Sequence, residues 1–155
     1  MHETFLRRAI QLAVENVEQG RGGPFGAVVV IDNEIVAEGS NLVTAHADPT
    51  AHAEIVAIRN ACARLRRHDL RGAVLYSSCE PCPMCLAAIY WARLDAFYYA
   101  ADRHAAAGAG FDDTFLYQQI PLDDASRALP SRRLLPAEGA APFRAWLDSE
   151  SKIPY

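Results

Sequence analysis

The sequence predicts a single α/β domain with helices on both faces of a mixed β-sheet. Three observations support this fold class. Short apolar strand patterns alternate with longer helical patterns, which indicates strand–helix–strand units. Two of the strand patterns are joined by a short turn sequence, Asp-Asn, which indicates an antiparallel hairpin. The chain has 155 residues, enough for one domain with a sizeable core, and no internal repeat divides it.

The N-terminal elements are a helix and a hairpin. Residues 3–18 carry apolar side chains at helical spacing, and Gly20 ends this amphipathic helix. Residues 27–31, Ala-Val-Val-Val-Ile, form an unbroken, largely β-branched run that is typical of a strand buried on both faces. Residues 32–33, Asp-Asn, predict a tight turn into a second strand at residues 35–38.

The middle of the chain alternates helices and strands. Thr50 is the predicted cap of a helix whose last turn carries Arg64, Arg66, Arg67 and His68. Residues 74–77 and 97–99 predict the third and fourth strands, and a helix opened by Pro83 lies between them. That helix is apolar nearly all round, so we expect it to be central and buried. The strand–helix–strand order predicts parallel pairing by right-handed crossovers.

The last fifty residues are less regular and are punctuated by prolines. Residues 132–135 are expected to form a fifth strand, and Pro142 is well placed in the first turn of a terminal helix. We therefore expect one domain over residues 1–155, with five strands in its sheet.

Composition narrows the function classes. The formal net charge is −4, which does not indicate nucleic-acid binding, and no apolar run approaches the ~20 residues of a membrane span. The N-terminus shows no signal-peptide pattern. Three of the four cysteines crowd together at Cys79, Cys82 and Cys85, which suits a metal site in a reducing compartment better than a disulfide framework. We expect a cytoplasmic protein.

Two short motifs carry the chemistry. His52-Ala53-Glu54 and Pro81-Cys82 to Cys85 together form H-x-E…P-C-x-x-C, the pattern of zinc deaminases. His52, Cys82 and Cys85 supply three ligands for Zn²⁺, which leaves one of four positions for water. Hydroxide formed there would attack an amino-bearing ring carbon, and ammonia would leave. Glu54 points away from the ligand direction of His52 and is assigned as the proton shuttle.

Another interpretation of the same cysteines is a structural zinc site with four protein ligands, which would stabilise the fold without catalysing a reaction. Such a site needs a fourth ligand, and Cys79 is the candidate, although it precedes Pro81 and lies off the helical face of the other two cysteines. A non-catalytic, zinc-stabilised binding module is the corresponding function, and the intact Glu54 argues against it. Glu80, beside the ligands, is a residue that orients one of them rather than a catalyst.

Beyond these motifs, the sequence resembles the cytidine-deaminase-like superfamily, and within it the bacterial guanine deaminases. The resemblance runs almost the whole length, through residues 22–26, 48–54, 78–85, 89–92, 110–113 and the closing Tyr155. The Phe-Asp-Asp element at residues 111–113 and the long tail favour guanine deaminase within the superfamily. The resemblance implies a three-layer α/β/α sandwich and zinc-dependent hydrolysis of guanine to xanthine and ammonia.

The resemblance also implies roles for residues outside the metal motif. Asn41 and Asp113 would hydrogen-bond the purine, and Phe25, Trp91 and Tyr155 would enclose it. From the residues alone, Asn41 is equally a turn residue, Asp113 a helix-start residue, and the two aromatics Phe25 and Trp91 core side chains. The resemblance further implies a homodimer that exchanges a C-terminal segment of about residues 136–155. A tRNA adenosine deaminase and a cytosine-type deaminase are alternatives on the same scaffold.

Overall fold

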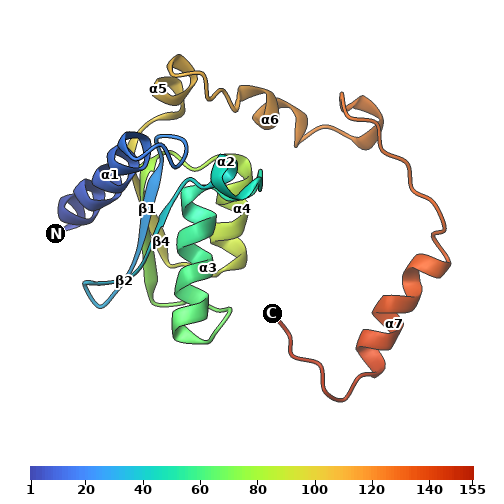
Figure 1. The fold of residues 1–155 in the computed structure, drawn as a ribbon. Coiled ribbons are helices and arrows are strands. Elements are labelled where there is room, and N and C mark those ends of the chain that lie inside the picture. Colours follow the sequence, from blue (N-terminus) through green and yellow to red (C-terminus); the bar gives the residue numbers. More distant parts are fainter. The chain divides into compact units, whose positions relative to one another are not determined.

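The computed structural model describes residues 1–155, which form two units, residues 1–113 and residues 114–155. The first unit contains α1 (His2–Glu18), β1 (Gly26–Ile31), β2 (Glu34–Ser40), α2 (Val43–His46), α3 (Ala53–Leu65), β3 (Ala73–Cys79), α4 (Pro83–Trp91), β4 (Ala96–Ala101) and α5 (Arg103–Gly108) (Figure 1). The second contains α6 (Thr114–Gln119), two 3₁₀ turns at Asp124–Ser126 and Glu138–Ala140, and α7 (Ala141–Asp148). None of these helices has the length and apolar character needed to cross a bilayer.

The sheet of the first unit is mixed, in the order β2-β1-β3-β4. β1 pairs antiparallel with both β2 and β3, and β3 pairs parallel with β4. The predicted hairpin is confirmed: Asp32 and Asn33 both have positive φ, as a two-residue turn that matches the strand twist requires. The predicted parallel pairing is confirmed for β3 and β4, whereas β2 and β3 run in the same direction but are separated by β1.

Alternate residues of β1 face two different helical layers. Val28 and Val30 pack with Phe5 and Leu12 of α1 on one face of the sheet. Val29 belongs to the cluster on the other face, where α3 and α4 contribute Ala53, Ala57, Ile58, Ala61, Ile89 and Ala92. The period-two alternation of a strand thus joins both layers through one buried segment. The expected three-layer α/β/α architecture is confirmed.

The α3 layer lies unusually close to the sheet. A Cβ atom added at Gly39 of β2 would lie 2.3 Å from the Ala53 carbonyl oxygen and 2.5 Å from the Ala57 amide nitrogen. Only glycine allows this approach, and small alanines face it from the helix. The contact fixes the start of α3, where the predicted metal and catalytic residues lie.

Two expectations about the fold are wrong. The sheet has four strands, because residues 132–135 are irregular and exposed, with Leu135 at a φ of 53°. Prolines on both sides of that segment also remove donors that a sheet ladder would use. The helix from Pro83 to Trp91 is not buried all round within this chain: only Cys85 and Ile89 are buried, and Trp91 is 69% exposed.

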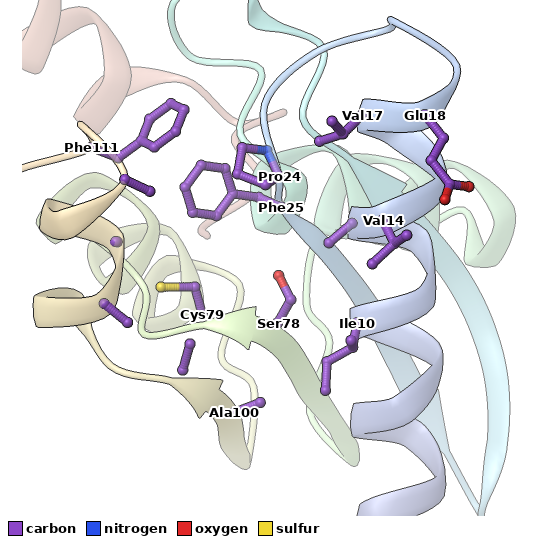
Figure 2. A pocket seen from close by; sticks show the side chains of 15 residues that line it. Ile10, Val14, Val17, Glu18, Pro24, Phe25, Ser78, Cys79, Ala100 and Phe111 are labelled. Carbon is purple, nitrogen blue, oxygen red and sulfur yellow. The ribbon is translucent and has the colours of Figure 1, made fainter.

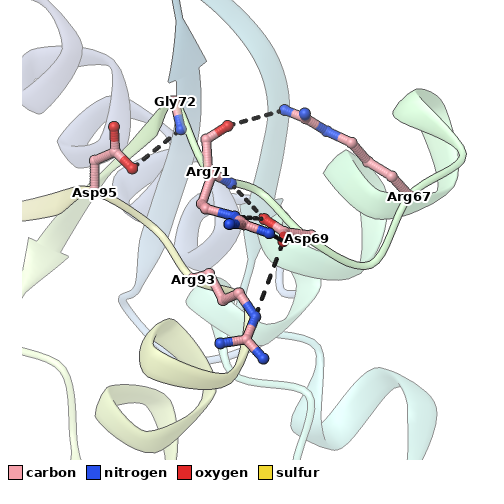
Figure 3. Close-up of polar contacts among 6 residues, drawn as sticks. All are labelled: Arg67, Asp69, Arg71, Gly72, Arg93 and Asp95. Atoms are coloured by element: carbon pink, nitrogen blue, oxygen red, sulfur yellow. Dashed lines mark hydrogen bonds and ion pairs between the residues drawn. The ribbon is translucent and has the colours of Figure 1, made fainter. Parts of the chain in front are cut away.

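The basic segment after α3 is held by local contacts. Arg71 pairs with Asp69, Arg67 donates to the Arg71 carbonyl oxygen at 3.2 Å, and Arg93 Nε lies 3.9 Å from the Asp69 carboxylate (Figure 3). Asp95 accepts the Gly72 amide at 3.0 Å. These contacts join the segment before β3 to the segment between α4 and β4. They favour a structural role for the arginines over a nucleic-acid surface.

Candidate metal centre and active site

The three predicted ligands lie together at two helix starts. His52 is the N-cap residue of α3, Cys82 is the N-cap residue of α4, and Cys85 lies in the first turn of α4. Their ligand atoms all lie within 4.8 Å of one another. Thr50 is not the cap of α3, as the sequence suggested, because its hydroxyl and amide both bond to the Asp48 carboxylate.

The spacing of these atoms matches a tetrahedral zinc ion. Zinc binds sulfur at about 2.3 Å and nitrogen at about 2.0–2.1 Å, so tetrahedral angles place the two ligand atoms about 3.5 Å apart. The His52 Nδ1 atom lies 3.6 Å from the Cys82 sulfur and 3.5 Å from the Cys85 sulfur. The residues therefore fit this metal without rearrangement.

The charges of the two thiols also favour a cation between them. The Cys85 thiol donates to the Cys82 sulfur and lowers the pKa of Cys82 to about 4, and His52 acts in the same direction. The Cys82 thiolate and burial then raise the pKa of Cys85 far above its usual range. Without a cation, only one of the two thiols ionises, and a divalent metal would neutralise both of them as thiolates.

Glu54 lies in the first turn of α3, beside the ligands but outside the metal-binding group. Its side chain is buried, with 6% of the residue exposed, and burial raises the pKa of its carboxyl. The nearby Cys85 thiol acts in the opposite direction and lowers the pKa of Glu54. A buried carboxyl of raised pKa next to a metal centre is suited to take up and release a proton during a reaction.

Asn41 and Asp113 both lie near segments that carry the ligands: Leu42, after Asn41, donates to Ala51, before His52, and the Asp113 carboxyl is affected by the charge of Cys82. Asn41 follows β2 directly and is buried, with its Oδ1 atom accepting the amides of Gly23 at 3.4 Å and Val43 at 3.3 Å. Its Nδ2 atom is therefore the group turned away from the backbone. Asp113 is half-buried, and desolvation together with the charge of Cys82 raises the pKa of its carboxyl.

The three predicted aromatics are placed differently. Phe25 is half-buried and packs edge-on against Phe111, with ring centroids 5.0 Å apart. Trp91 ends α4, roughly 12 Å of helix away from the ligands at its start. Tyr155 belongs to the second unit, where it is 74% exposed. Phe25 lies in the loop before β1, where its carbonyl oxygen accepts the Asn41 amide at 3.1 Å.

Cys79 and Glu80 do not join the metal-binding group. Cys79 is buried, its sulfur lies 3.7 Å from the Asp102 carbonyl oxygen, and burial raises the pKa of its thiol to about 11. Glu80 accepts the Arg103 amide at 3.0 Å, which ties the segment before Cys82 to the start of α5. The group of potential ligands thus contains three residues and not four.

An apolar groove of about 570 Å³ lies next to this region, between α1 and α5 (Figure 2). Val14 and Ile10 line one side, Phe25 and Phe111 another, and Cys79 with Ser78 the base. None of the three potential metal ligands lines it.

Two residues of this region were not singled out by the sequence reasoning. Phe111 was noted only as part of a motif, although it packs on Phe25. Asn16 is fully buried on α1, and its position could have been found from helical spacing, since it falls on the same face as Leu12 and Ala9. A polar residue in an apolar stripe is the signal to look for.

Comparison with known proteins agrees with the geometry. Residues 1–101 match the family described as cytidine and deoxycytidylate deaminase zinc-binding region. The chain is 53% identical over 154 residues to guanine deaminase from Bacillus subtilis, covering 99% of each chain. It superimposes on the X-ray structure of that enzyme with a TM-score of 0.98, covering 100% of this chain and 99% of the other.

A second class of relative is more distant. A tRNA-specific adenosine deaminase from Aquifex aeolicus is 36% identical over 137 residues, covering 82% of this chain and 90% of that protein. The family match, together with the donor set formed by one histidine and two cysteines, confirms the prediction of zinc. The chain therefore belongs to the cytidine and deoxycytidylate deaminase family of zinc-binding enzymes, as a homologue of guanine deaminase.

Proposed function

We propose that this protein is a guanine deaminase that hydrolyses guanine to xanthine and ammonia. The observation that carries the proposal is the buried carboxyl of Glu54 beside a group of three ligands, His52, Cys82 and Cys85. Three protein ligands are the number found in catalytic zinc sites, whereas structural sites use four. The identity to guanine deaminase over 99% of both chains supports the choice of substrate.

The residues around the metal handle one water molecule and one base. Bound zinc acts as a Lewis acid that brings the pKa of water toward neutrality. A Glu54 carboxylate oxygen takes a proton from water as the oxygen atom bonds to the amino-bearing carbon of guanine. Glu54 then returns that proton to the ring nitrogen and moves the remaining hydroxyl proton to the amino group, so the carbonyl forms, the carbon–nitrogen bond breaks and ammonia leaves. One water is consumed and no other reactant is needed.

The polar side chains of Asn41 and Asp113 select the base. Asn41 has its oxygen occupied by backbone amides, so its Nδ2 group is the donor for an acceptor on the ring. The Asp113 carboxylate accepts ring N–H donors. Guanine offers both kinds of group, and a base with the wrong edge would leave buried polar atoms unpaired. Phe25 contributes an aromatic wall.

We further propose that the protein is a homodimer that exchanges residues 136–155, so that Tyr155 closes the partner's site. Large apolar side chains are exposed in both units, among them Trp91 in the first and Phe143 and Leu147 in the second. Exposed apolar surface of this extent marks a protein–protein interface. In such a dimer the exposed Trp91 side chain would lie in the interface between the two copies, and it would contact a bound base from there. The free cysteines favour a reducing, cytoplasmic location.

The proposal is tested by incubating the zinc-loaded protein with guanine, adenine, cytosine and a tRNA anticodon stem–loop, and following each reaction by absorbance or nucleoside analysis. We expect guanine to be converted to xanthine with a kcat/KM at least ~100-fold above the other substrates. Light scattering of the same sample should give the mass of a dimer. Preference for the tRNA, or no turnover of guanine with zinc bound, would overturn the proposal.

A further inference from the structure

Asn16 is a buried polar residue on the apolar face of α1, with none of its surface exposed. Its Nδ2 group donates to the Gly23 carbonyl oxygen at 2.9 Å and to the Asn41 carbonyl oxygen at 2.8 Å. Its Oδ1 atom is buried without any hydrogen-bond partner. A buried acceptor of this kind lowers stability and therefore needs an explanation.

The two carbonyl groups that Asn16 holds belong to the segments that orient the Asn41 side chain. The Asn41 Oδ1 atom accepts the Gly23 amide on one side and the Val43 amide on the other. The Asn41 backbone amide also donates to Phe25 at 3.1 Å. Asn16 thus bonds to the backbone of Asn41 itself and to the residue whose amide holds the Asn41 side chain.

The packing at Gly22 leaves no room for a side chain beside these bonds. A Cβ atom added at Gly22 would lie 2.3 Å from the Asn41 carbonyl oxygen and 3.2 Å from the Asn16 Nδ2 atom. The next residue, Leu42, donates to the Ala51 carbonyl oxygen at 2.9 Å, and Ala51 directly precedes His52. Asn16 is therefore one end of a bonded chain that runs through Asn41 to the metal-ligand segment.

We propose that Asn16 is a positioning residue for the base-binding amide of Asn41. The inference rests on the proposed function, in which Asn41 donates to the purine. An apolar residue at position 16 would remove the unpaired oxygen, but the Asn41 carbonyl oxygen would lose the Asn16 donor and the Gly23 carbonyl oxygen would keep only the Phe25 amide, at 2.9 Å. The Asn16 amide offsets the cost of its unpaired oxygen because its two hydrogen bonds fix the Asn41 segment. The Asn41 Nδ2 group is therefore oriented toward the base before the base binds.

The test uses Asn16→Asp, which keeps the shape of the side chain but replaces the donor with an acceptor facing two carbonyls. We expect the KM for guanine to rise about tenfold, the factor that corresponds to one orienting hydrogen bond, while kcat falls less and zinc content is unchanged. Asn60→Ala is the matched control, because Asn60 makes the same kind of bond, to the Glu38 carbonyl at 2.9 Å, on the exposed side of α3.

A double-mutant cycle separates positioning from general stability. In an Asn41→Ala background the Asn16→Asp change should have little further effect on KM, whereas independent effects would multiply and would overturn the proposal. If Asn16→Asp does not fold, Asn16→Ala is used in the same cycle, since it removes the donor without adding charge.

A second measurement does not depend on the reaction. The side-chain amide of Asn41, assigned in a ¹⁵N spectrum by its loss in Asn41→Ala, should give one sharp signal in the native protein and a shifted or broadened one in the Asn16 variant. An unchanged signal overturns the positioning role even if guanine is the substrate. Failure of the native protein to deaminate guanine overturns the proposed function and leaves this spectral test to decide on Asn16.

Discussion

Residues 1–113 and residues 114–155 solve the problem of burying apolar side chains in different ways. Every buried residue belongs to the first region, where α1 covers one face of the sheet and α3 with α4 covers the other. The second region has no buried residue, although it carries Phe115, Leu116, Phe143, Trp146 and Leu147. The first region holds its own core, and the second presents apolar surface that only another surface can cover.

The difference indicates which part of the function depends on each region. The metal-binding group, Glu54 and Asn41 all lie in the first region, on elements fixed by its core. The second region contributes only Tyr155 among the predicted site residues. Chemistry should therefore fail when the first region's site is changed, and closure of the site should fail when the second is changed.

The largest effect is expected from Glu54→Gln, which removes the proton shuttle but keeps the size of the side chain. We expect the kcat for guanine to fall by roughly 10³-fold, within the range for loss of a general acid–base group. Zinc content, measured by atomic absorption, should not change, because Glu54 lies outside the ligand group.

Glu34→Gln is the control for this change, since Glu34 is an exposed carboxyl at the start of β2. Activity retained in Glu54→Gln would move the proton transfer to another residue and break the assignment of catalysis to the start of α3.

A smaller effect is expected from deleting residues 149–155, the segment after α7. If this segment closes the site of a partner, kcat/KM for guanine should fall about tenfold or more, as expected for loss of one aromatic contact. The thermal unfolding temperature should stay within a few degrees, because none of these residues is buried. Tyr155→Ala should reproduce most of the loss, and unchanged kinetics in both variants would show that the second region does not close the site.

The sequence predicted the first region better than the second for a physical reason. The hairpin at Asp32 and Asn33 follows from local turn chemistry, and the two-faced strand at residues 27–31 follows from its apolar run. The metal-binding group followed from spacing, because each ligand sits at a helix start within a short motif. These features are local, so a single sequence contains them.

The failures are features that depend on distant partners, apart from the cap predicted at Thr50. The fifth strand at residues 132–135 has no neighbour with which to pair in this chain, and α4 is apolar all round although this chain covers only one side of it. Thr50 was predicted to cap α3, but its hydroxyl donates to the Asp48 carboxylate instead. The bond from Asn16 to Asn41 joins residues 25 positions apart, and no local pattern indicates it.

The smallest effect is expected from the ion pair that joins α1 to β2 in the first region. Arg8 donates twice to the Glu38 carboxylate, at 2.7 Å for each bond, and this lowers the pKa of Glu38. A lowered carboxyl pKa in the folded state stabilises the protein above the unfolded pKa, and that stabilisation disappears as the pH falls through the folded pKa. Because both side chains are about one-third exposed, we expect no more than about 1 kcal/mol at neutral pH.

Glu38→Gln should therefore lower the Tm of zinc-free protein by about 1–3 °C at pH 7, and the difference from the native protein should vanish below the folded pKa of Glu38. Asp124→Asn is the control from the second region, where Asp124 pairs with Arg127 on an exposed turn. It should leave the Tm unchanged, because unfolding of the core does not involve that pair. An equal loss in both variants would mean that the two regions unfold as one cooperative unit, and that the second region contributes to the stability of the first.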